Sequence, residues 1–217
     1  MTTSKQIQLL EKLTNKKVIL ENDFFKQHIL SKEEKLERRL NSIRRILIKS
    51  GTYKGDLYLK NIKLLDSLYN LERVEGDLYL ENTSIKDLGK LEYVGGYLYL
   101  YNTPIRDLGK LERVESWLYL TNTSIESLGK LKHVGGSLGL GNTLIKDLGK
   151  LEYVGGDLDL RNTQIKDLYK LEYVGGYLDL ENSLIKDLGN LEHVEGDVYI
   201  NSKTPLYHNK ELIEEYK

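Results

Sequence analysis

The chain has 217 residues and a formal net charge of -1, with 40% hydrophobic and 30% charged residues, which fits a soluble protein with a substantial core. Cysteine is absent, so disulfides, thiol catalysis and thiolate metal sites are excluded. The absence of cysteine also favours a reducing compartment. Residues 1–17 are too polar for a signal peptide or a membrane span, so we expect a cytoplasmic protein with no membrane partner.

The first 51 residues differ in charge from the rest of the chain. They carry twelve Lys and Arg against six acids, a balance of +6, whereas the remainder carries twenty against twenty-seven, a balance of -7. Ser31 and Glu34 match a helix capping box. An apolar stripe at helical spacing follows at Leu36, Leu40, Ile43 and Leu47. We predict that residues 1–51 are a basic, helical N-terminal cap, because the first copy of a repeat array would otherwise expose its core.

A twenty-residue repeat occupies most of the chain. The stretch 77–96, DLYLENTSIKDLGKLEYVGG, recurs five more times without a gap, and a related copy precedes it from Gly55. Each copy contains an L-x-L segment whose two leucines share one face, which predicts a short strand. Eight such segments occur, the last at Val198–Ile200. A fixed period of this length predicts a solenoid, here a repeat array over residues 52–202.

The remaining positions of each copy predict its turns. Asp87 and its equivalents suit the start of a short helical turn, with Ser127 in the same role. Gly95 and Gly96 are expected to turn the chain in conformations that other residues avoid. The Asn82 and Thr83 columns are expected to bond loop backbone as a ladder. After Ser202 the repeat fails, so we predict a C-terminal cap over 203–217, with Asn209 starting a short helix.

These residues resemble the leucine-rich repeat family. The segment Leu78-x-Leu80-x-x-Thr83-x-Ile85 is similar to the family's L-x-L-x-x-N-x-L core. The entry V-x-G-x-L, from Val74 to Leu78, is more similar to the receptor L-domain branch, a β-helix-like relative. The resemblance implies an α/β solenoid with parallel strands on the concave face and irregular or 3₁₀ turns on the convex face. It also implies a binding scaffold rather than an enzyme.

The outward-facing strand positions vary while the frame repeats. They hold eight of the sixteen tyrosines and the single Trp. Strand neighbours place five aromatic residues in one patch: Tyr97, Tyr99, Tyr101, Trp117 and Tyr119. Exposed aromatic side chains are enriched at protein interfaces, which favours a binding surface. The alternative is that aromatic stacking along the sheet serves stability alone.

A strand without side chains adjoins this patch. Ser137, Gly139 and Gly141 predict a notch between an aromatic wall at Trp117 and Tyr119 and a charged wall. The charged wall comprises Asp157, Asp159 and Arg161. Such a notch could take a side chain, a peptide or a small ligand. Neutral drift within the repeat is the alternative.

Neither a metal site nor an active site is predicted. Asp159 and Asp179 are adjacent across strands, but flat strand carboxylates beside Arg161 fit a Ca²⁺ shell poorly. His133 and His193 share a repeat column with tyrosines, which indicates surface variants. No phosphate loop or His-x-x-x-His motif occurs, so we expect no catalytic residue and no cofactor.

The leading hypothesis is a non-enzymatic module that binds an unidentified protein through its concave strand face. Richness in Lys, Asn, Ile and Tyr is typical of AT-rich genomes, so a phage or viral source would suggest a host-factor inhibitor. One alternative is a small-ligand binding or sequestering protein that uses the notch at Gly139. The other is nucleic-acid binding through Arg38, Arg45 and Lys49, which lacks a groove-reading motif. The oligomeric state stays open. The predicted binding residues are Tyr79, Tyr97, Tyr99, Tyr101, Trp117, Tyr119, Gly139, Asp157, Asp159, Arg161, Tyr177 and Asp179.

Overall fold

The structure is a computed structural model that describes residues 38, 40–49 and 51–209. The chain divides into two compact units, Met1–Arg44 and Arg45–Lys217, which are considered separately. Of the first unit, only residues 38 and 40–44 are described, and they are helical. The predicted capping box at Ser31 and Glu34 lies outside the described residues, as does Leu36.

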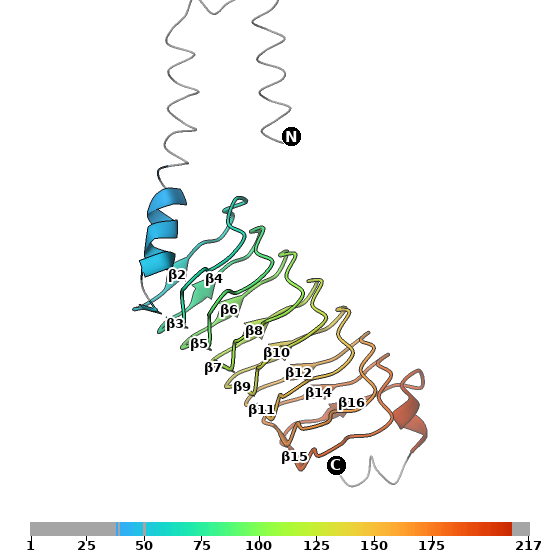
Figure 1. Ribbon diagram of the computed structural model, residues 1–217. Coiled ribbons are helices and arrows are strands. Elements are labelled where there is room, and N and C mark those ends of the chain that lie inside the picture. Colours follow the sequence, from blue (N-terminus) through green and yellow to red (C-terminus); the bar gives the residue numbers. More distant parts are fainter. Residues whose placement is uncertain (1–37, 39, 50, 210–217) are drawn as a thin grey trace, which may run out of the picture. The chain divides into compact units, whose positions relative to one another are not determined.

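The second unit is a parallel β-solenoid of twenty-residue coils with little helix (Figure 1). Each coil contributes one two-residue strand to each of two eight-stranded sheets. The first sheet, called the β1 sheet, comprises β1 (Thr52–Tyr53), β3 (Arg73–Val74), β5 (Tyr93–Val94), β7 (Arg113–Val114), β9 (His133–Val134), β11 (Tyr153–Val154), β13 (Tyr173–Val174) and β15 (His193–Val194). The second, called the β2 sheet, comprises β2 (Leu57–Tyr58), β4 (Leu78–Tyr79), β6 (Leu98–Tyr99), β8 (Leu118–Tyr119), β10 (Leu138–Gly139), β12 (Leu158–Asp159), β14 (Leu178–Asp179) and β16 (Val198–Tyr199).

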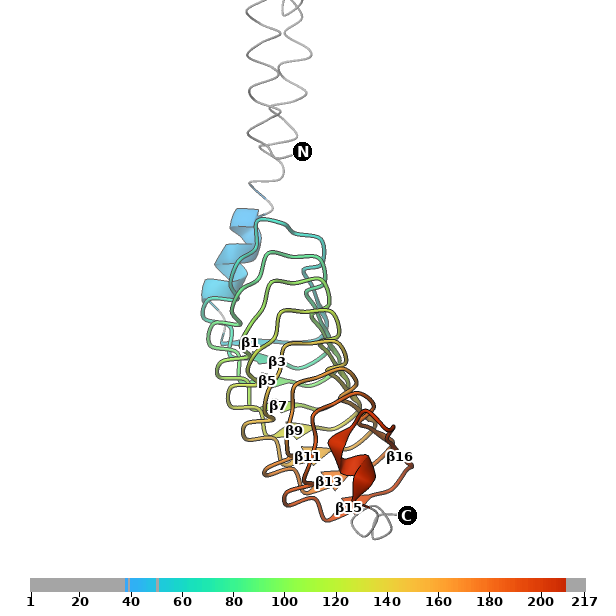
Figure 2. The ribbon, with the colours of Figure 1, turned by 90° about the vertical axis from the view of Figure 1, so that its right-hand side faces the viewer.

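The eight predicted L-x-L strands form the β2 sheet, but the β1 sheet was not predicted. Figure 2 shows the odd-numbered strands one after another along one side of the solenoid. In both sheets each residue pairs with its equivalent in the next coil, as Leu98 does with Leu118 and Val94 with Val114. The sequence reading assigned Val94 only to the returning segment. A segment with one inward and one outward residue is too short to show an alternating pattern.

The core consists of six apolar side chains from each coil. In the coil around β6 these side chains are fully buried at Val94, Leu98, Leu100, Ile105, Leu108 and Leu111. Burying one such side chain stabilises a fold by about 1.5–3 kcal/mol. Because a coil contacts only its neighbours, this set must recur in every copy. That requirement explains why these columns scarcely vary.

Two polar columns hold the bend that follows each β2-sheet strand. The Thr103 hydroxyl donates to the Leu100 carbonyl at 2.6 Å, so the predicted backbone bond of this column is confirmed within its own coil. The Asn column instead bonds side chain to side chain, as when Asn102 Nδ2 donates to Asn82 Oδ1 at 3.1 Å. Asn102 also has a φ of 56°. Asn tolerates this left-handed conformation better than most residues, which explains its recurrence.

The third side of each coil is irregular. Asp107 and its equivalents accept the amide N–H two residues later, as Asp87 Oδ1 does from Gly89 at 2.9 Å. Ser127 does the same for Gly129 at 3.0 Å, as expected. The expected helical turn does not form there in residues 51–202. A two-residue bond of this kind closes a tight turn and leaves no room for a helical one.

The predicted reason for Gly95 and Gly96, a backbone conformation that other residues avoid, was wrong. In the described residues the left-handed glycines are those of the Gly89 column together with Gly55, whereas Gly95 and Gly96 have no positive φ. A Cβ on Gly95 would come 2.2 Å from the Glu75 carbonyl oxygen. The local backbone at Gly95 therefore leaves no space for a Cβ, although Glu75, Glu115 and Glu195 occupy the same column in other coils.

Both ends of the described solenoid carry non-repeat residues. At the first coil, Leu47 is fully buried, and Asn70 Nδ2 donates to the Ile48 carbonyl at 3.2 Å. At the last coil, the 3₁₀ helix η1 (Pro205–His208) follows Thr204, whose hydroxyl donates to the Leu180 carbonyl at 2.8 Å. The predicted helix after Asn209 lies outside the described residues.

Candidate functional site

A ladder of stacked tyrosines runs along the outer surface of the β2 sheet. Its rungs are Tyr58, Tyr79, Tyr99 and Tyr119, from strands β2, β4, β6 and β8. Successive ring centroids lie 4.5, 4.9 and 5.0 Å apart, with interplanar angles of 9–11°. The spacing matches the separation of neighbouring parallel strands, so the backbone sets it. We call the outer surface of the β2 sheet the tyrosine face.

Two further aromatic side chains lie beside the ladder. Tyr97 is tilted against Tyr99 at 5.8 Å, and Trp117 is tilted against Tyr119 at 5.6 Å. Tyr97 and Trp117 contact each other edge-on at 6.0 Å. Trp117 is 42% exposed. Four members of the predicted aromatic patch, Tyr97, Tyr99, Trp117 and Tyr119, thus form one cluster of ring contacts. The fifth member, Tyr101, follows strand β6 and is exposed.

Three of the ladder tyrosines have hydroxyls with raised pKa values. Tyr79 donates to Asp77 at 3.0 Å, and this bond raises the pKa of the Tyr79 hydroxyl. Burial raises the pKa of Tyr99 and of Tyr119. A phenol with a raised pKa stays protonated at neutral pH, so these rings present uncharged hydroxyls.

The ladder stops at Gly139, which stands in register with Tyr119. On the next strand, the carboxylate of Asp159 lies over Gly141, because a Cβ on Gly141 would come 2.7 Å from Asp159 Oδ2. A Cβ on Gly139 would meet only the Thr121 hydroxyl, at 3.0 Å. Gly139, which we call the bare rung, therefore places no side chain of its own between the Tyr119 ring and Asp159, and the Thr121 hydroxyl is its nearest neighbour. Of the residues predicted to form the notch, Asp157, Asp159 and Arg161 line a hollow, whereas Trp117, Tyr119 and Gly139 do not.

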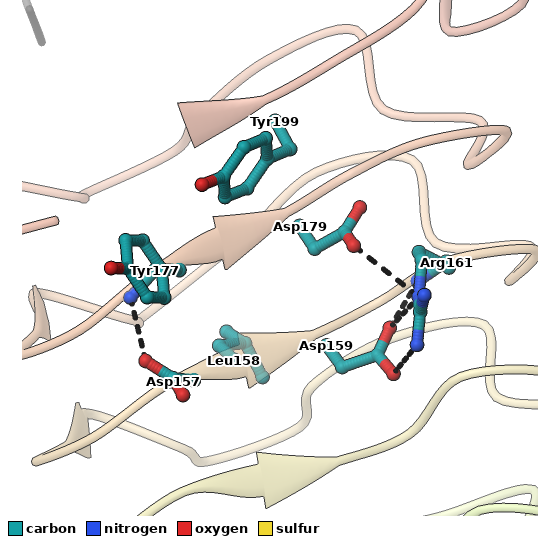
Figure 3. A pocket seen from close by; sticks show the side chains of 7 residues that line it. All are labelled: Asp157, Leu158, Asp159, Arg161, Tyr177, Asp179 and Tyr199. Atoms are coloured by element: carbon teal, nitrogen blue, oxygen red, sulfur yellow. Dashed lines mark hydrogen bonds and ion pairs between the residues drawn. The ribbon is translucent and has the colours of Figure 1, made fainter. Parts of the chain in front are cut away.

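A hollow of about 200 Å³ follows the bare rung (Figure 3). Tyr177 and Tyr199 stand on one side of it, with Asp159, Asp179 and Arg161 on the other. Its floor is Leu158, and Asp157 completes the lining. The hollow thus combines aromatic rings with three carboxylates and one guanidinium group.

Arg161 is committed to two of these carboxylates. It makes a bidentate pair with Asp159 at 2.9 and 3.0 Å, and its Nε lies 3.3 Å from Asp179 Oδ2. Burial raises the pKa of the Asp179 carboxyl, and the hydrogen bond from the Glu181 amide and the charge of Arg161 offset this only in part. Including Asp157, one positive charge faces three negative ones, so the hollow has an excess of negative charge.

Several residues that directly precede the first leucine of an L-x-L segment have a structural role that the sequence did not reveal. Asp77 Oδ1 accepts the Tyr97 amide at 2.8 Å, and Asp157 Oδ1 accepts the Tyr177 amide at 2.9 Å. Ser137 does the same for Asp157. These acceptors tie the corner between the two sheets from one coil to the next. Asp157 therefore contributes to the hollow while one of its oxygens is already engaged.

A carboxylate beside the ladder is incompletely bonded. Glu81 is buried, and its Oε1 lies 3.9 Å from Lys60 Nζ. Its Oε2 has no hydrogen-bond partner in the part of the chain that the structure describes. A buried carboxylate oxygen without a partner is costly, so Glu81 is a local weakness of this face.

A second ladder of planar side chains, missed by the sequence reading, runs along the β1 sheet. His133, Tyr153 and Tyr173 stack at 4.5 and 4.8 Å, both with interplanar angles of 3°. Further along the column, the Arg73 guanidinium lies 3.4 Å from the Tyr93 ring centroid. The histidines are therefore rungs of a stack rather than isolated surface variants. The recurrent pattern of a planar residue directly before valine was the available signal.

The described residues hold no group of three or more His, Asp and Glu side chains arranged to bind a metal ion. None of the helices in the described ranges is both long and apolar enough to cross a membrane.

No protein-family model, no curated protein and no solved structure matches this chain. The repeat solenoid is therefore supported by its strand pairing and its periodic sequence.

Proposed function

We propose that this protein is a non-enzymatic interaction module that binds another protein through its tyrosine face. The observation that carries the proposal is the ring cluster of Tyr97, Tyr99, Trp117 and Tyr119 on a repeated backbone, in which Trp117 is exposed and the three tyrosines are half-buried. Tyr and Trp present large contact areas at little cost in conformational entropy. An aromatic patch with charged side chains nearby, here Asp157, Asp159 and Arg161, fits the anatomy of a protein interface.

The proposal includes a finer view of the scaffold. We infer a leucine-rich repeat variant in which the tyrosine face is the concave binding side and residues 1–51 are a helical cap. The burial of Leu47 and the bond from Asn70 to Ile48 support the cap.

The experiment is capture of partners from a lysate of the producing or host cell by the immobilised full chain, with Trp117→Ala and Tyr99→Ala variants in parallel. Loss of the same captured proteins in both variants supports the tyrosine face. Tyr153→Ala is a matched control, because it removes a stacked tyrosine from the other sheet. Capture that is unchanged by Trp117→Ala and Tyr99→Ala would refute the proposal.

The other two candidate functions have weaker support. The hollow lined by Asp157, Asp159 and Tyr177 holds about 200 Å³. Small-molecule pockets usually hold roughly 300–1,000 Å³, so this hollow suits a side chain better than a sequestered ligand. For nucleic-acid binding, the described residues show exposed Arg38, Arg45 and Lys49, with no aromatic ring stacked among them.

A further inference from the structure

We propose that the bare rung at Gly139 receives the guanidinium group of an arginine side chain on the partner protein. This inference rests on the proposed function and specifies the chemistry of the partner. It follows from the shape of the gap in the ladder, from a stacking pair elsewhere in the same chain, and from the local charge.

The shape calls for a planar group. Tyr99 is stacked on both faces, by Tyr79 and by Tyr119, while Tyr97 lies tilted at its edge. Trp117 is inclined by 54° to Tyr119, so it does not stack on that ring. In the described residues no ring stacks on the second face of Tyr119, and the residue in register on that side is Gly139. A flat group placed one strand spacing further, about 4.8 Å, would continue the ladder.

The β1 sheet shows what can fill such a rung. There the Arg73 guanidinium stands on the strand next to Tyr93 and stacks on its ring at 3.4 Å. Backbone pairing and register are the same in the two sheets, with parallel strands and equivalent residues opposed. A guanidinium group thus fits a rung next to a tyrosine in this solenoid.

The local charge selects a cation over a neutral ring. The Asp159 carboxylate stands at the corner of the bare rung, and Asp157 and Asp179 lie beyond it. Arg161 is paired with Asp159 and Asp179 and neutralises only one of the three charges. Arginine is favoured over lysine because a guanidinium is planar, stacks on aromatic rings and is weakly hydrated, whereas an ammonium is a compact, strongly hydrated charge.

The single Trp reports on this site, because Trp117 lies 5.6 Å from Tyr119. The probe is the peptide acetyl-Gly-Arg-Gly-amide, titrated into the full chain while Trp117 fluorescence is followed. We expect a saturable change with a Kd on the order of 1 mM, as befits one side chain. The lysine peptide should bind roughly 5- to 10-fold more weakly, and the uncharged citrulline peptide should give no saturable change.

Two variants test the position. Gly139→Tyr fills the rung and should abolish the response to the arginine peptide. The matched control is Gln164→Tyr, which adds a tyrosine at an exposed position on the irregular side and should leave the response unchanged. Asp159→Asn keeps the rung open but removes one charge, and should reduce the arginine-over-lysine and arginine-over-citrulline preferences several-fold. Circular dichroism shows whether each variant is folded. If Gly139→Tyr does not fold, the Asp159→Asn variant alone tests the inference.

The outcomes separate this inference from the proposed function. If Trp117→Ala abolishes partner capture but Gly139→Tyr and Asp159→Asn leave both capture and peptide binding unchanged, the arginine inference fails and the interaction face stands. If none of the three changes capture, the function itself fails. Equal binding of the three peptides overturns the arginine inference. Concentration-dependent self-association that is lost in Gly139→Tyr would identify a second copy as the occupant and overturn the proposal of a separate partner.

Discussion

The indole of Trp117 lies directly against Gly136 of the next coil. A Cβ on Gly136 would come 2.1 Å from Cδ1 of Trp117, nearer than two carbon atoms can approach. The orientation of the most exposed ring in the cluster thus depends on a glycine that belongs to the repeated frame. A residue of the repeated frame, Gly136, thus determines how a residue of the tyrosine face, Trp117, is oriented.

Gly136→Ala should therefore displace the indole. We expect a shift in Trp117 emission and a loss of partner capture, together with a lower Tm. Gly156→Ala is the matched control, because the atoms nearest to its Cβ would belong to Ser137 and the Gly136 backbone rather than to the indole. An equal change of Trp117 emission in both variants would show that the effect is a general loosening of the coils.

Tyr169 occupies a column that is otherwise mostly glycine and has a φ of 50°. Left-handed backbone costs a non-glycine residue about 1 kcal/mol or more. Tyr169→Gly should therefore raise the Tm by about 2–4 °C, less what the half-exposed ring contributes by packing. Thermal unfolding followed by circular dichroism measures the shift.

The reverse change is available as a control in the preceding coil. Gly149 has a φ of 60°, and an added Cβ there would meet no atom closer than 3.8 Å. Gly149→Ala should thus lower stability through backbone conformation alone. A decrease in Tm for both variants would contradict the assignment of strain to Tyr169.

The stacked His133 makes stability depend on pH. Burial, with a smaller contribution from the charge of Arg113, lowers the pKa of His133 in the folded state. The unfolded chain, with a histidine pKa of about 6.5, then binds more protons than the folded chain in the window below that value. The stabilising contribution of neutral His133 is complete above about pH 6.5 and is lost as the pH falls through its lower folded-state pKa.

His133→Tyr should remove this part of the pH dependence, because tyrosine does not titrate in that range. Tyrosine already occupies the neighbouring rung at Tyr153, so the stack should persist. Urea unfolding at neutral and at acidic pH, compared between wild type and variant, measures the difference. An unchanged difference in unfolding free energy would exclude His133 as its source.

The Asn ladder separates two contributions to each bend. Asn102→Gly removes the side-chain bond to Asn82 but keeps a residue that accepts a φ of 56°. Asn102→Ala removes the bond and also strains the backbone. We expect the Ala variant to be less stable than the Gly variant by about 1 kcal/mol, measured by chemical denaturation. Equal stabilities would mean that the hydrogen bond accounts for the whole preference for Asn.

Local repetition let the sequence alone predict much of this fold. Leu98 and Leu100 alternate with Tyr99, and the same alternation recurs at every twentieth residue, so the β2 sheet, its eight strands and its parallel register followed directly. The outward position of the Tyr79, Tyr99 and Tyr119 column and the bare rung at Gly139 followed from the same alternation. A period fixes these features because each coil contacts only its neighbours.

The tertiary structure decided what depends on contacts between coils. The β1 sheet rests on the pairing of two-residue strands such as Tyr93–Val94, which are too short to show alternation. The direction in which Asp77 and Asp157 turn, toward the amide of the next coil, depends on how the corner closes. The same holds for Trp117 against Gly136 and for Arg161 between Asp159 and Asp179. A periodic sequence states which residues share a column, but distances and side-chain directions within a column arise only when the coils pack.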